Sequence, residues 1–149
     1  MNEGKFLPPA YLFASLASMV LLSLFIPLYA LIPYPWNATG LLPLALGVAL
    51  NASTDNVLKK HDTTVKPFEV STTLITTGVF NFSRNPMYLG MVLILIGAAL
   101  LLGTLSPLIT IPLFAITMDR IFIFAEEKML EKRFGDEWKQ YKTNVRRWI

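Results

Sequence analysis

Two short segments carry the polar residues best suited to chemistry, and each lies beside a long apolar stretch. The first is the Arg-Asn-Pro run at 84–86, whose residues are typical of a helix start. The asparagine side chain can cap the helix by accepting a hydrogen bond from a backbone amide of the first turn. The proline lacks an amide that would have no partner at the first helical position. The second contains Asp119, Arg120 and the adjacent pair Glu126 and Glu127. Acidic side chains at a membrane helix end are costly unless they face water, a cation or a polar cavity. Together the segments predict a cleft with carboxylates, a guanidinium and apolar walls, the usual form of a small-molecule site.

The two glutamates are expected to have different partners. Adjacent residues point about 100° apart on a helix. We therefore expect at most one of Glu126 and Glu127 to face the helix that begins near Arg84. We expect the other to meet a lysine or arginine of the C-terminal segment.

The composition indicates which kind of fold positions these residues. Residues of the set AVILMFWYC make up 54% of the chain and charged residues only 15%, whereas an ordinary soluble domain is about 25% charged. Residues 6–54 and 85–118 contain no Asp, Glu, Lys or Arg. A membrane-spanning helix needs roughly 20 apolar residues. The sequence thus predicts an all-α polytopic membrane protein with about four transmembrane helices and a cytosolic amphipathic C-terminal helix.

We expect one membrane domain over residues 1–149. In the C-terminal tail, aromatic and apolar residues alternate with lysine and arginine, which is typical of a helix lying in the membrane interface; we expect it to be broken near Gly135. It would serve as a surface anchor or as a lid over the cleft. The expected elements are transmembrane helices at 7–32, 41–57, 86–102 and 107–127, a cytoplasmic loop at 55–83, and the interfacial tail at 128–149.

The basic residues predict the orientation. All 13 Lys and Arg residues fall in the N-terminal segment, the central loop or the C-terminal part, which four spans would place on one side. The positive-inside rule assigns that side, with both termini, to the cytoplasm. We expect an uncleaved N-terminal anchor, and the membrane would be the inner or plasma membrane if the source is bacterial or archaeal. The net charge of +3 then reflects contact with anionic lipid headgroups.

Several function classes lack support. The chain has no cysteine, and its single histidine, His61, lies in a polar run without a second ligand nearby, so we expect no metal site. No glycine-rich strand–turn–helix fingerprint suggests a Rossmann nucleotide site. No basic patch interleaved with stacking aromatics suggests a nucleic-acid partner.

Three ordered motifs stand out in the second half of the chain. The first is Gly78-Val79-Phe80 followed by Arg84-Asn85-Pro86-Met87-Tyr88-Leu89-Gly90. The second is the pair Glu126-Glu127, about 40 residues on. The third is Phe134-Gly135-Asp136-Glu137-Trp138 with Tyr141. Together these motifs resemble those of the integral-membrane methyltransferases, a group that includes isoprenylcysteine carboxyl methyltransferases and phospholipid N-methyltransferases. The resemblance covers about 63–148, slightly over half of the chain.

The resemblance implies a cytosol-facing S-adenosylmethionine site, roofed by the tail and open sideways to lipid. The acceptor would be a lipid-like or amphiphilic molecule that enters from the bilayer. Glu126 and Arg84 would suit the amino and carboxylate groups of the cofactor. We take Arg84, Arg120 and Glu127 as catalytic candidates. The cofactor-binding positions carried over by motif are Thr72, Thr73, Leu74, Ile75, Phe80, Asn85, Pro86, Met87, Tyr88 and Glu126.

Two other functions remain open from the sequence. Sterol-reductase-like membrane enzymes have similar helix-start and tail motifs but use NADPH. A non-enzymatic scaffold built on a helical hairpin would also account for the apolar segments. The oligomeric state is not indicated by any feature of the sequence.

Overall fold

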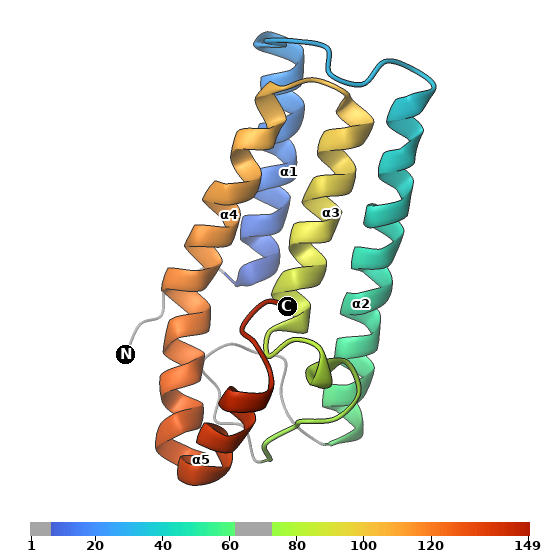
Figure 1. The fold of residues 1–149 in the computed structure, drawn as a ribbon. Helices are drawn as coiled ribbons and strands as arrows, with labels where there is room; N and C mark the ends of the chain where they lie inside the picture. Colours follow the sequence, from blue (N-terminus) through green and yellow to red (C-terminus); the bar gives the residue numbers. More distant parts are fainter. Residues whose placement is uncertain (1–6, 62–72) are drawn as a thin grey trace.

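The computed structural model describes residues 7–61 and 73–149, and its described part is built from helices (Figure 1). A 3-10 turn at Trp36–Gly40 leads into the second helix, and further 3-10 turns lie at Gly78–Asn81 and Ser106–Ile109. A π-helical turn at Asp119–Ile123 joins the last two helices into one rod. The α-helices are α1 (Pro8–Phe25), α2 (Leu41–Lys60), α3 (Pro86–Leu102), α4 (Thr110–Met118) and α5 (Phe124–Asn144).

Helix α3 lies at the centre, with α2 on one side and α1 and α4 on the other (Figure 1). Helix α5 continues the line of α4 beyond the other helices and then turns back. The turn is at Gly135, whose φ of 51° is a conformation that glycine adopts at little cost. The break expected there is thus present. It returns the chain to the start of α3, where the C-terminus lies (Figure 1).

The exterior of the bundle is apolar. Three helical stretches are long and apolar enough to cross a membrane, namely Pro8–Phe25, Trp36–Lys60 and Ser106–Asn144, and α3 is a shorter apolar helix. Large hydrophobic side chains such as Phe13 and Phe25 point outward, where lipid rather than water would stabilise them. The protein is therefore an all-helical integral membrane protein, as predicted. The number of spans and the cytoplasmic orientation of the termini stay predictions.

The first helix is shorter than expected. It ends at Phe25 rather than near Ile32, because Pro27 cannot donate the helical hydrogen bond and disfavours helical geometry in the residue before it. The following segment pairs with the turn after α3. The Leu31 amide donates to the Gly103 carbonyl at 2.8 Å, and the Leu105 amide donates to the Tyr29 carbonyl at 2.9 Å.

Glycines set the close approach of α2 and α3. A Cβ on Gly47 would lie 2.5 Å from the Gly90 carbonyl oxygen, and a Cβ on Gly97 would lie 2.6 Å from the Gly40 carbonyl oxygen. Small residues at helix contacts let backbones pack without intervening side chains. These two glycine pairs therefore fix α3 against α2 and, with it, the position of the helix start at Pro86.

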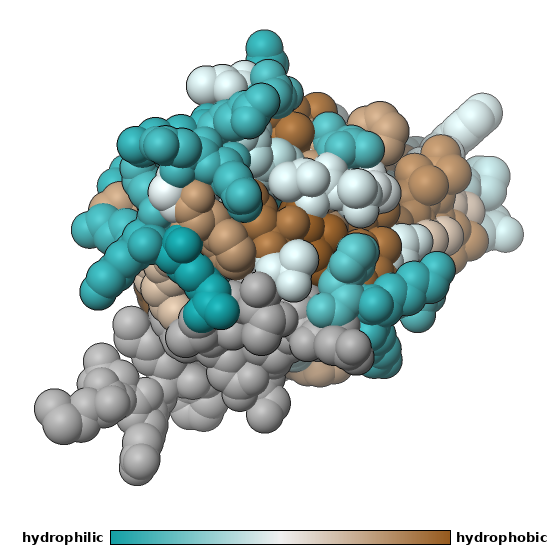
Figure 2. All heavy atoms as spheres, turned by 90° about the horizontal axis from the view of Figure 1, so that it is seen from below, coloured by the Kyte–Doolittle hydropathy of each residue, from teal (hydrophilic) through white to brown (hydrophobic). Residues whose placement is uncertain are grey.

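The polar end of the molecule contains the C-terminal end of α2, the start of α3 and all of α5 (Figure 1). Figure 2 views the protein from this end and shows hydrophilic side chains arranged around a hydrophobic area. Deeper in the bundle lies a core of fully buried side chains that includes Met19, Leu95, Met118 and Phe122. The polar segments singled out in the sequence all meet at this end.

Candidate functional site

A hydrogen bond joins the two polar segments. The Tyr88 hydroxyl, in the first turn of α3, donates to Glu126 Oε1 at 2.7 Å, and Glu126 lies in the first turn of α5. Pro86 occupies the first turn of α3, where its missing amide costs nothing. The hairpin of α3 and α4 thus brings the helix start and the glutamate pair together, as the sequence predicts.

Glu127 is the centre of a partly buried ion network. Arg84 Nη1 lies 3.1 Å from Glu127 Oε1, and both side chains are 8% exposed. Arg147 Nη2 donates to Glu127 Oε2 at 2.6 Å, while its Nη1 donates to Asp119 Oδ1 at 3.0 Å. The hydrogen bond with Glu127 raises the pKa of Arg147 above its usual value, so its guanidinium stays charged.

The ion network contradicts one expectation about the two glutamates and confirms another. Glu127 meets an arginine of the C-terminal segment, Arg147, as expected. However, both glutamates contact the start of the opposite helix, Glu126 through Tyr88 and Glu127 through Arg84. The expectation that at most one would do so is wrong, because Arg84 precedes α3 and its long side chain reaches a different face of α5.

The π turn explains how Asp119 and Glu127 share one arginine. On a regular α-helix two residues eight positions apart point about 80° from each other, and one extra residue in a π turn reduces this to about 20°. The π turn at Asp119–Ile123 thus aligns the two carboxylates on one face. Its wider backbone also places the adjacent residues Phe122 and Ile123 in the core, both fully buried.

The C-terminal residues are tied to the start of α3. Asn85 Nδ2 donates to the Arg147 carbonyl at 3.0 Å, and the Arg84 amide donates to the Arg146 carbonyl at 3.0 Å. The side chain of Asn85 therefore does not cap α3, contrary to expectation, because it is directed to this carbonyl instead. The Ser83 hydroxyl accepts a hydrogen bond from the Asn85 amide at 3.1 Å. The tail is thus held against the helix start.

A second, smaller apolar cluster lies between α5 and the segment before α3. Trp138, Tyr141 and Val145 are buried there, and Leu74 and Phe80 pack against them. The Tyr141 hydroxyl donates to the Phe80 carbonyl at 2.7 Å. The central loop therefore packs, over its described residues 73–83, against the C-terminal part of α5.

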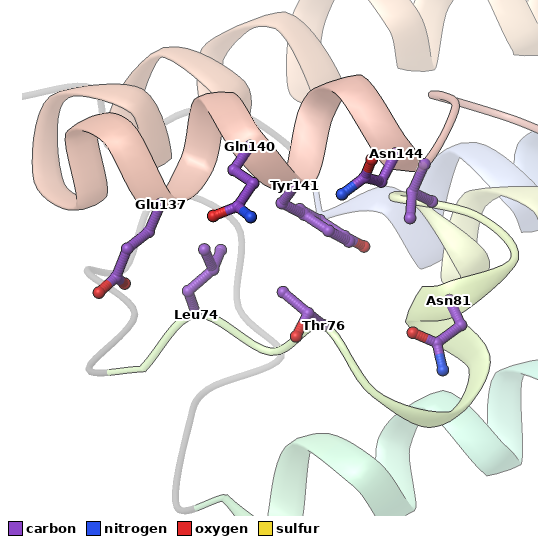
Figure 3. Close-up of a pocket in the computed structure, with 8 residues that line it drawn as sticks. Leu74, Thr76, Asn81, Glu137, Gln140, Tyr141 and Asn144 are labelled. Atoms are coloured by element: carbon purple, nitrogen blue, oxygen red, sulfur yellow. The ribbon is translucent and has the colours of Figure 1, made fainter.

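A pocket of about 410 Å³ opens beside this cluster, within the range of roughly 300–1,000 Å³ usual for small-molecule sites. Figure 3 shows its two walls, one from the segment before α3 and one from α5. Among the described residues of its lining, Glu137 has the only charged side chain. The lining residues are Leu74, Thr76, Asn81, Glu137, Gln140, Tyr141, Asn144 and Val145.

Only some of the predicted site residues lie at the pocket or in the ion network. Leu74 lines the pocket, Ile75 is buried beside it in the chain, and Thr73 is exposed; Thr72 lies outside the described residues. Met87 packs against the main core. Arg120 is exposed, and within the described part of the chain it takes no part in the ion network. The network thus contains two of the three catalytic candidates, Arg84 and Glu127, and leaves Arg120 out.

Sequence reasoning expected a basic residue of the C-terminal segment at the glutamates without singling out Arg147, and it included Trp138 in the third motif without giving it a role. Trp138 is 2% exposed, and the Arg84 guanidinium lies 5.5 Å from the centre of its ring. Counting charges indicates that a residue such as Arg147 is needed. The three acidic residues at 119–127 would otherwise face only one basic residue, Arg84, from the start of α3. A second cation was therefore required, and the tail supplies it.

This geometry defines a class of protein: a small helical integral membrane protein with a charged, partly apolar site at one end of its bundle. Residues 36–137 match the model of the family described as phospholipid methyltransferase. That is more than half of the chain. The chain belongs to the phospholipid methyltransferase family.

Individual relatives agree with this assignment. The chain is 32% identical over 157 aligned residues to the protein-S-isoprenylcysteine O-methyltransferase of Saccharomyces cerevisiae, covering 97% of this chain and 63% of that protein. It is 32% identical over 75 residues to the enzyme of the same name from Schizosaccharomyces pombe, covering 48% of this chain and 30% of that protein. An uncharacterised Haemophilus influenzae protein is 40% identical over 63 residues, which are 42% of this chain and all of that protein.

A solved structure has the same fold. A eukaryotic intramembrane Ras methyltransferase, isoprenylcysteine carboxyl methyltransferase, superposes with a TM-score of 0.67 at 23% identity. The match covers all of this chain and 53% of that one. The chain thus spans little more than half of the solved protein, and under two thirds of the two yeast enzymes.

Proposed function

We propose that this protein is an S-adenosylmethionine-dependent methyltransferase whose acceptor is a lipid-like or amphiphilic molecule that enters from the bilayer. The observation that carries the proposal is the hydrogen bond between Tyr88 and Glu126, together with the neighbouring pair of Arg84 and Glu127. These contacts bring together the motifs that the resemblance assigns to the cofactor. Membership of the phospholipid methyltransferase family supports the same reaction class.

The donor set of the site fits the cofactor. Its amino group requires a carboxylate, which Glu126 supplies, and its carboxylate requires cationic or amide donors, of which Arg84 is one. Its adenine requires an apolar slot. The pocket beside Leu74 and Tyr141 has such a wall and is large enough for a nucleoside. We therefore assign the cofactor to the polar end, between the segment before α3 and α5.

When bound, S-adenosylmethionine supplies a methyl group on a sulfonium, which a nucleophile takes by in-line displacement. The contribution of this chain is mainly positioning and exclusion of water. Glu127 is held by two guanidiniums, so we assign it to fixing Arg84 and the start of α3 rather than to moving a proton. We propose no catalytic role for Arg120, because it is exposed and outside the network.

The surroundings of the site indicate which kind of methyl acceptor can reach it. The helices beside the polar end expose apolar side chains to the membrane, so a molecule with an apolar chain can reach the site without leaving the bilayer. The two yeast relatives are named as isoprenylcysteine O-methyltransferases, and the family is named for phospholipid methylation. An acceptor with a long apolar chain is common to both names.

Titration calorimetry on the detergent-solubilised protein tests the proposal. We expect saturable binding of S-adenosylmethionine and no binding of NADPH. Glu126→Gln should weaken the binding at least tenfold, because it removes the charge that pairs with the cofactor's amino group. Glu131→Gln is the matched control, since Glu131 is exposed on the same helix.

The alternatives give different results. Binding of NADPH instead of S-adenosylmethionine would indicate a reductase, and binding of neither would indicate a scaffold. An equal loss of affinity in Glu126→Gln and Glu131→Gln would overturn the assignment of Glu126.

A further inference from the structure

Two buried side chains at the polar end carry N–H groups that have no hydrogen-bond partner in the described part of the chain. They are Arg84, through Nε and Nη1, and Trp138, through Nε1. Their side chains are 8% and 2% exposed, so water does not readily satisfy them. A buried donor without a partner costs about 1–3 kcal/mol, and more when it is charged. Such groups in a native protein call for an explanation.

The two side chains belong to one place in the fold. The Arg84 guanidinium carbon lies 5.5 Å from the centre of the Trp138 ring, although the residues come from opposite sides of the site. Arg84 Nη1 has Glu127 as its ion-pair partner at 3.1 Å, whereas Nε has neither an ion-pair partner nor a hydrogen-bond partner in the described part of the chain. Trp138 belongs to the cluster with Tyr141 and Val145, both of which line the pocket. Figure 3 shows Tyr141 in the pocket wall.

The chemistry of the pair restricts the ligand. Guanidinium and indole nitrogens donate hydrogen bonds and accept none, so the missing group must be an acceptor. Guanidinium groups prefer the oxygens of carboxylates and phosphates. At this site an anionic oxygen group has two sources, the carboxylate of the cofactor and the phosphate of a membrane lipid. The closeness of Trp138 to the pocket favours the cofactor.

We propose that Arg84 Nε and Trp138 Nε1 form the carboxylate subsite for S-adenosylmethionine. This inference rests on the proposed function and extends it, because it assigns Trp138 a ligand contact that neither the family match nor the motif comparison gives it. Glu126 then faces the amino group of the same methionyl end.

Decarboxylated S-adenosylmethionine is the discriminating probe, because it keeps the adenosine, the sulfonium and the amino group and lacks the carboxylate. By calorimetry on the wild-type protein, we expect it to bind roughly 10- to 100-fold more weakly than S-adenosylmethionine, the loss of one or two charged hydrogen bonds. Trp138→Phe keeps an aromatic ring and removes the donor. It should weaken S-adenosylmethionine binding about tenfold and leave binding of the decarboxylated probe unchanged.

Trp36→Phe is the matched control. Trp36 is an exposed tryptophan at the other end of the bundle, so both affinities should stay as in the wild type. An equal loss for both ligands in Trp138→Phe would assign the residue a structural role and overturn the subsite. The wild-type comparison of the two ligands tests the subsite even if that variant does not fold.

The two proposals can fail separately. If the wild type binds both ligands with equal affinity, the carboxylate subsite is wrong and the cofactor assignment stands. If it binds neither, both are wrong. If adding phosphatidylglycerol to the micelles displaces S-adenosylmethionine and Trp138→Phe abolishes that competition, the donors hold a lipid phosphate and the subsite is overturned.

Discussion

Arg147 links several parts of the site through its side chain and its carbonyl, and its replacement gives a prediction with a matched control. Its guanidinium contacts Asp119 and Glu127 at 3.0 and 2.6 Å, and its carbonyl accepts from Asn85. We expect Arg147→Met to lower the stability of the protein because it leaves Asp119 without its cation. Arg146→Met is the control, since the Arg146 side chain is exposed and its carbonyl, which Arg84 uses, is unaffected.

The magnitude follows from burial. Removing one partner of a buried ion pair costs about 3–5 kcal/mol. The Arg147 side chain is 33% exposed and Glu127 keeps its contact with Arg84, so we expect a smaller loss, about 2 kcal/mol. In a chain of this length that corresponds to a fall in Tm of about 4–8 °C. Arg146→Met should change the stability by less than about 0.5 kcal/mol.

Thermal unfolding of the two variants in the same detergent provides the assay. The comparison is direct because the two substitutions remove the same charge from adjacent residues. Equal Tm values for Arg147→Met and Arg146→Met would refute the idea that the network holds the tail. A fall confined to Arg146→Met would do so as well.

Two further substitutions test the packing that positions the site. Gly47→Ala should destabilise the protein by about 1–3 kcal/mol, because its Cβ would meet the Gly90 carbonyl at 2.5 Å; a rise in Tm, the usual result of adding alanine to a helix, would contradict the close approach of α2 and α3. Tyr141→Phe should cost about 1 kcal/mol through loss of the hydrogen bond to the Phe80 carbonyl, measured by thermal unfolding. Tyr29→Phe, at an exposed tyrosine, should have no effect, and matching losses in the two would show that the Phe80 contact contributes nothing.

The sequence predicted those parts of the site that depend on local rules. Pro86 marks the start of α3 because proline suits that position. Gly135 marks the break in α5 because the chain there needs a positive φ. The meeting of Tyr88 and Glu126 follows from an antiparallel hairpin of two apolar segments, which returns the second segment to the surface where the first began.

The remaining features depend on packing that no local rule reveals. The π turn at Asp119–Ile123 has no signature in its residue types, so the alignment of Asp119 with Glu127 could not be predicted. The role of Arg147 depends on how the chain turns after α5, which is a tertiary property. The early end of α1 was open to prediction, since Pro27 lies inside the expected helix.

Methyl transfer into membrane lipid tests the central claim most directly. The measurement incubates the purified protein in detergent with S-adenosylmethionine labelled in its methyl group and with lipid extracts, and then counts label in the lipid fraction. We predict label in the lipid fraction with the wild type and with Glu131→Gln, and its loss with Glu126→Gln. Folded wild-type protein that transfers no label in any extract would contradict the account.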